Sequence, residues 1–90
     1  MDEAKVQELL RQYDERYFNG RLAGYRVVVS ERFVGGLCDR KNKVIFLNPK
    51  CSTSTCCLLL HEMAHATGGD GHGRRFQSEI RRLIGLGAPL

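Results

Sequence analysis

The chain has 90 residues, 42% hydrophobic and 27% charged, with a formal net charge of +4. This length indicates one domain spanning residues 1–90, which buries enough surface to fold without obligatory disulfides or structural metals. No apolar run approaches the ~20 residues that cross a membrane, and the acidic start is unlike a secretory signal. We therefore expect a cytoplasmic protein, or a nuclear one if the source is eukaryotic. The four cysteines form no C-x-x-C pair, which favours buried free thiols over disulfides.

The first half of the chain predicts a helix followed by three short strands. Apolar residues recur at helical spacing from about Glu3 to Phe18, and Asn19-Gly20 ends the pattern. The β-branched segment Tyr25–Ser30 predicts a strand. Residues 35–39 and 43–48 flank a short polar loop, which predicts a hairpin. We expect these strands to form a small antiparallel three-stranded sheet.

The second half predicts two helices separated by a glycine-rich turn. Serine and threonine residues at 52–55 are N-cap candidates for a helix that is apolar on nearly all sides, which indicates a buried central position. The turn at Gly68–Gly71 ends this helix, and a last helix is predicted from about His72 to Leu83. Four arginines lie roughly opposite the apolar side of that last helix: Arg74, Arg75, Arg81 and Arg82.

The central helix contains the segment His61-Glu62-Met63-Ala64-His65. Residues four apart lie one helical turn apart, so His61 and His65 can bind one metal ion. Glu62 lies about 100° around the helix from His61, where it can take a proton from a water molecule at the open position of the metal. We therefore predict Glu62 as the catalytic base and acid and not as a ligand.

A catalytic zinc ion usually takes three protein ligands and leaves a fourth position for water. His72, which follows the glycine-rich turn, is the predicted third ligand. Asp70 or Glu79 replaces it if the turn directs His72 away from the helix. Glu79 could instead accept a hydrogen bond from the ring of His72, although an exposed helical glutamate is the commoner interpretation. Histidines without a metal are disfavoured, because polar groups in a buried helix are costly unless something engages them.

Together these residues resemble the SprT-like metalloprotease domain over about residues 5–85. The similar segments are His61–His65, the HGxxF segment His72–Phe76, Tyr17–Leu22 at the end of the first helix, and the hairpin with Gly35-Gly36 and Ile45–Asn48. The resemblance implies an α+β minimal zincin fold: an N-terminal helix, a small antiparallel sheet, the HExxH helix and a C-terminal helix. It also implies Zn²⁺ bound by His61, His65 and His72, with Glu62 as the catalytic acid and base. One departure is the short spacing of six residues between the second and third histidines.

The function that the resemblance implies is zinc-dependent endopeptidase activity on protein substrates. We expect an extended peptide to pair with an edge strand around Val44–Leu47, and Tyr25 or an arginine near the turn is a candidate donor to the tetrahedral oxyanion. Two other functions stay open. One is a zinc-containing nucleic-acid or protein binding module with little or no proteolysis. The other is a zinc-dependent amidase or peptidase of cell-wall or small-peptide substrates.

The charge of the chain bears on its partners. Its pI is about 9.1, and the face of four arginines on the last helix could contact phosphates. Eukaryotic SprT-like proteins act on proteins crosslinked to DNA, so the resemblance makes single-stranded DNA a candidate partner. A solvated arginine face is the commoner meaning of such a stripe. We expect a monomer without membrane contact.

Overall fold

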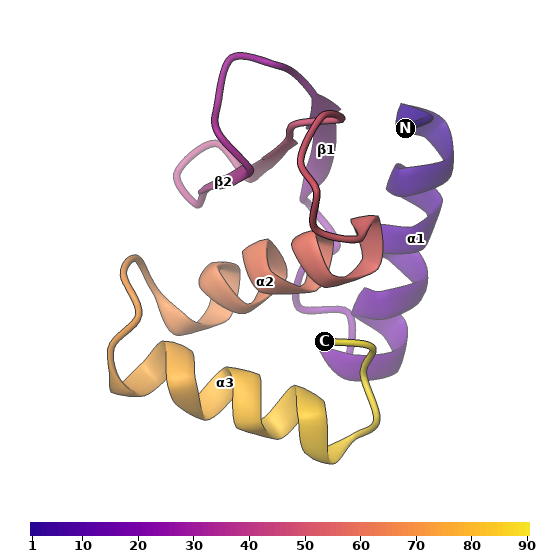
Figure 1. Cartoon of the computed structure of the whole chain (residues 1–90). Helices are drawn as coiled ribbons and strands as arrows, with labels where there is room; N and C mark the ends of the chain where they lie inside the picture. The colour runs from indigo at the N-terminus through magenta and orange to yellow at the C-terminus, as the bar shows by residue number, and fades with distance from the viewer.

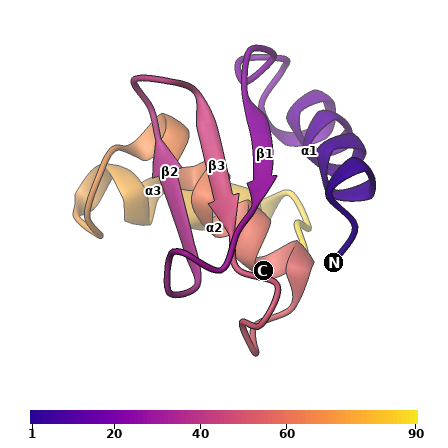
Figure 2. The ribbon, with the colours of Figure 1, turned by 90° about the horizontal axis from the view of Figure 1, so that it is seen from above.

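The computed structural model describes all 90 residues and shows a three-stranded sheet with the first helix beside it and the last two helices stacked in layers on one of its sides (Figures 1 and 2). The elements in order are α1 (Glu3–Tyr17), β1 (Arg26–Val29), β2 (Gly36–Asp39), β3 (Val44–Leu47), α2 (Thr55–Gly68) and α3 (Arg74–Gly85). This α+β order is the predicted one. None of the helices combines the length and the apolar character needed to pass through a membrane.

The sheet is mixed, so the prediction of an antiparallel sheet is wrong for one of its two pairings. The strand order is β1-β3-β2, with β1 parallel to β3 and β2 antiparallel to β3. From the end of β1 the chain crosses to the opposite edge of the sheet, where it forms β2, and the hairpin then leads back into β3 (Figure 2). β3 therefore enters between the other two strands and runs in the same direction as β1.

Helix α1 closes one edge of this sheet. The backbone N–H groups of Val27 and Val29 point away from β3 and towards α1. Val27 donates to the side-chain oxygen of Gln7 and Val29 donates to the carboxylate of Glu3, both at 2.7 Å. The amide of Gln7 also donates to the carbonyl of Tyr25 at 3.4 Å. Side chains of the first helix thus satisfy groups that would otherwise leave β1 open to another strand.

The opposite edge, formed by β2, is open. Asn48 donates its backbone N–H to the carbonyl of Gly35 at 2.7 Å. This bond shows which residues of β2 direct their backbone groups towards β3 and which direct them away from it. Gly36 and Cys38 therefore direct their backbone N–H and C=O groups away from β3. The segment Val44–Leu47, predicted as an edge strand, is instead the central strand.

The hydrophobic core lies between the sheet and the helices, with α2 at its centre. The prediction of a buried central helix is confirmed, because its apolar side chains are fully or nearly fully buried: Leu58, Leu59, Leu60, Met63 and Ala64. Strand β3 and helix α3 pack the remaining sides with Ile45, Leu47, Phe76 and Leu83. The four cysteines are unpaired and only half-buried, so the prediction of buried thiols is wrong in the degree of burial.

Candidate metal centre

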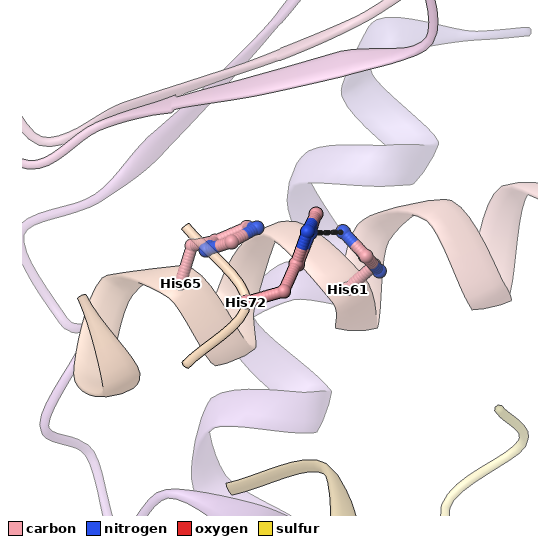
Figure 3. A group of neighbouring side chains, drawn as sticks. All are labelled: His61, His65 and His72. Atoms are coloured by element: carbon pink, nitrogen blue, oxygen red, sulfur yellow. Dashed lines mark hydrogen bonds between the residues drawn. The ribbon is translucent and has the colours of Figure 1, made fainter. Parts of the chain in front are cut away.

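Three imidazoles converge beside the second half of α2 (Figure 3). His61 and His65 project from adjacent turns of the helix, and His72 reaches them from the turn before α3. One ring nitrogen from each lies within 4.8 Å of the other two. The Nε2 atoms of His61 and His72 are 3.3 Å apart.

The spacing of His61 and His72 fits a tetrahedral metal ion. Zinc–nitrogen bonds of about 2.0–2.1 Å at tetrahedral angles place neighbouring ligand nitrogens about 3.3–3.4 Å apart. The His61–His72 distance matches that value, and three neutral imidazoles are a donor set that suits zinc and other late transition metals. The residues present therefore fit a divalent ion with one position left for solvent.

The end of α2 orients the ring of His65. Its Nδ1 lies 2.8 Å from the carbonyl oxygen of Gly69, to which it donates a hydrogen bond. The proton on Nδ1 leaves the lone pair of Nε2 free for a metal ion. Gly69 is the C-cap of α2 and has a φ of 87°, a conformation that side-chain-bearing residues rarely adopt.

Electrostatics keep His61 neutral. Burial lowers the pKa of His61, and the nearby rings of His65 and His72 lower it further. Only a neutral imidazole offers a lone pair to a metal ion. The environment therefore holds this ring in its ligating form near neutral pH.

Glu62 lies on the same helix beside the three rings, and its side chain is almost completely buried. Burial raises its pKa to about 7. A divalent cation bound by the neighbouring imidazoles would act in the opposite direction and favour the carboxylate. A carboxyl group poised between these two influences can both accept and return a proton near neutral pH.

A cavity of about 300 Å³ joins Glu62 to the histidines. Its other walls are the open strand β2 and the glycine-rich turn, through Gly36, Leu37, Cys38, Asp70 and Gly71. Gly36 is a site residue that sequence reasoning missed, since a Cβ atom there would lie 2.9 Å from the side chain of Glu62. Other hollows line α1 and α3, but none of them contains these histidines.

The sequence model of the SprT-like family matches residues 6–87 of the chain. This chain belongs to the SprT-like family. The crystal structure of the metallopeptidase zymogen of Pyrococcus abyssi abylysin is similar to this SprT-like fold, with a TM-score of 0.70 at 20% sequence identity. The likeness covers 87% of this chain and 78% of that chain, and it confirms the predicted α+β fold. A search of curated protein sequences found no match.

The two alternative third ligands lie outside the cluster of this SprT-like protein. Asp70 faces solvent and forms a 3.5 Å ion pair with Arg40. Glu79 accepts hydrogen bonds from Thr67 at 2.9 Å and from Arg82 at 2.7 Å. The proposed contact from Glu79 to His72 is therefore absent. The interpretation of Glu79 as an exposed glutamate is also wrong, because it connects α2 to α3.

Two further expectations about side chains are corrected by the structure. Arg82 does not belong to a solvated arginine face: it donates to the carbonyl of Tyr17 and lies 5.0 Å from the centre of the Phe18 ring. Arg74, Arg75 and Arg81 remain exposed. Tyr25, a candidate oxyanion donor, does not line the cavity at the histidines and instead lines a hollow against α1.

Proposed function

We propose that this SprT-like protein is a zinc-dependent endopeptidase that cleaves extended segments of protein substrates. The observation that carries the proposal is the convergence of His61, His65 and His72, whose ligand nitrogens lie within 4.8 Å of one another, beside the buried carboxyl group of Glu62. The fold shared with a protein described as a metallopeptidase zymogen supports the same class of chemistry.

The chain supplies the remaining parts of a hydrolytic site. When bound, the ion would supply Lewis-acid activation of the attacking water and of the scissile carbonyl. Glu62 is placed to take a proton from that water and to deliver it to the leaving amine. The buried setting of Glu62 beneath Gly36 restricts its movement, so the carboxyl group is held in position before a substrate arrives.

The open edge of the sheet is the proposed substrate-binding surface. Gly36 and Cys38 of β2 both line the cavity that contains the histidines, and their outward backbone groups can pair with an extended peptide. Pairing through backbone atoms gives affinity without strict sequence preference. Peptide pairing, which was expected at residues 44–47, is therefore assigned to β2 in this proposal, because both edges of β3 already pair with neighbouring strands.

Single-stranded DNA is proposed as a second ligand of the same protein. Arg74, Arg75 and Arg81 are exposed and make no ion pair, and the chain has a net charge of +4. Phosphate contacts of this kind weaken steeply as salt rises. A gel shift with single-stranded DNA that disappears with added salt supports this proposal, and no shift at low salt removes it.

Replacement of Glu62 by Gln is the central test of the endopeptidase proposal. We expect Glu62→Gln to retain one zinc ion per chain by elemental analysis and to lose cleavage of casein. His72→Ala is the matched variant that should lose zinc and activity together. Casein cleavage by Glu62→Gln at the parent rate refutes the role of the glutamate. A parent protein that binds zinc but cleaves neither casein nor DNA-bound protein is instead a zinc-containing binding module.

A further inference from the structure

One aromatic ring contacts all three imidazoles of the candidate metal centre. Phe76 of α3 is 3% exposed and stacks on His65, with ring centroids 4.2 Å apart and an interplanar angle of 22°. His72 and His61 meet the same ring edge-on, with centroid distances of 4.8 and 5.0 Å. No other side chain has an aromatic contact with the three histidines apart from the histidines themselves.

Hydrogen bonds alone do not orient this centre. A histidine that binds a metal usually donates its second ring nitrogen to a carboxylate, a carbonyl or water, which fixes the plane of the ring. His65 has such a partner in the carbonyl of Gly69. The only hydrogen bond made by the rings of His61 and His72 is the one that joins their Nε2 atoms, which are the atoms that face a shared ion. The orientation of these two rings therefore depends on packing.

A glycine on α2 determines how closely Phe76 approaches the histidines. A Cβ atom at Gly68 would lie 2.8 Å from the Cα atom and 3.1 Å from the backbone nitrogen of Phe76. These neighbours are backbone atoms and cannot rotate away. The absence of a side chain at Gly68 thus allows α3 to approach α2 closely at the position where the ring of Phe76 contacts the three imidazoles.

We propose that Phe76 is a positioning residue for the metal centre, and that Gly68 sets the depth at which its ring supports the three imidazoles. The inference rests on the proposed function only in requiring that the site binds a divalent metal. Its effect is greatest for His72, which is exposed on a turn between Gly71 and Gly73 and whose only aromatic neighbours besides Phe76 are the other two histidines. The ring of Phe76 holds that histidine in a ligating orientation.

Metal affinity, compared with stability, tests the proposal. In Phe76→Leu, which keeps an apolar side chain but removes the flat ring, we expect zinc affinity to fall about 10-fold or more by chelator competition. The absorption spectrum of bound Co²⁺ should also change. The matched control is Leu83→Ala, two turns further along α3 and fully buried. It should lower the thermal stability of the metal-free protein while zinc affinity stays within about threefold of the parent.

Gly68→Ala provides a second variant that retains the phenyl ring and displaces it. We expect the same direction of change in zinc affinity and Co²⁺ spectrum, so the proposal stays testable if Phe76→Leu does not fold. Parent-like zinc affinity and spectrum in Phe76→Leu overturn the inference, as does an equal loss of affinity in Leu83→Ala. Failure of the parent itself to bind zinc refutes the proposed function and is seen before any variant is compared.

Discussion

Gly36 of β2 lies against Glu62 of α2 so closely that a Cβ atom at position 36 would come within 2.9 Å of both Cγ and Oε2 of the glutamate. The edge strand of the sheet and the carboxyl group proposed for proton transfer are therefore packed against each other with no room for a side chain between them. An alanine at position 36 would displace the end of the Glu62 side chain, because that end moves more easily than either backbone.

For Gly36→Ala we predict a fall in kcat of about 10- to 100-fold, with zinc content unchanged, since small displacements of a catalytic group are costly. Steady-state kinetics on a fluorogenic peptide measure this change. Gly85→Ala is the matched control, because a Cβ atom there meets nothing within 4 Å. If the two variants have the same kcat, the contact between Gly36 and Glu62 has no catalytic role.

Glu62 should make the metal-free protein less stable as pH rises. Its pKa is about 7 in the folded chain, against an ordinary value of 4.5 for a glutamate exposed to water, so the unfolded state loses the proton first as pH rises. Between these values, folding must take up a proton, and stability falls with rising pH. Chemical denaturation in chelator should show that Glu62→Gln increases the free energy of unfolding by about 2 kcal/mol near pH 8 and by well under 1 kcal/mol near pH 5.

The control for this pH dependence is Glu31→Gln, which alters an exposed glutamate paired with Lys50. Its difference from the parent should be small at both pH values. A Glu62→Gln difference that is the same near pH 5 and near pH 8 would contradict the raised pKa of the glutamate.

The side chain of Gln7 should protect the edge of β1. Gln7→Ala removes the acceptor for the N–H of Val27 and the donor to the carbonyl of Tyr25. We predict a loss of about 1 kcal/mol in the free energy of unfolding and self-association at high concentration, because an open strand edge pairs with other chains. Sedimentation velocity and urea denaturation measure the two effects. Gln12→Ala, which loses only a 3.4 Å contact to Glu8 on the surface of α1, should show neither.

Arg82 should contribute to stability, unlike the other arginines of α3. Its guanidinium group connects the carbonyl of Tyr17, the ring of Phe18 and the carboxylate of Glu79. We predict that Arg82→Ala lowers the free energy of unfolding by about 2 kcal/mol, as expected for hydrogen bonds to a charged group. Arg75→Ala should change stability by less than about 0.5 kcal/mol. If both variants unfold like the parent, the structural role of Arg82 is refuted.

The sequence predicted that the three histidines lie together, because the signals for this proximity are local. The spacing of His61 and His65 is a property of one helix, and His72 follows after a turn too short to carry it far away. The SprT-like resemblance rests on the same segments and is confirmed by the family match. The roles of the three histidines as ligands and of Glu62 in catalysis stay predictions, which the experiments above address.

Features that depend on packing between distant segments were not predicted. Local patterns identify the strands but do not say that the segment 26–29 pairs with 44–47 in parallel. A helical wheel places Arg82 opposite Phe76, yet its long side chain reaches back to Tyr17 on another helix. From the sequence, Gly36 is an ordinary hairpin glycine. The group that leaves no room for a side chain there, the carboxyl group of Glu62, is distant in the sequence.

Six residues, three of them glycine, separate His65 from His72, and the turn that follows α2 joins these two ligands of the same proposed ion. A cation bound by residues on both sides of this turn would connect its two ends and would add stability that rises with the logarithm of the free ion concentration. Limited proteolysis should therefore cut the emptied protein within this turn and spare the loaded one. Loss of the ion would then do more than remove the proposed activity, because the metal-free protein would also be the form that proteases degrade most readily.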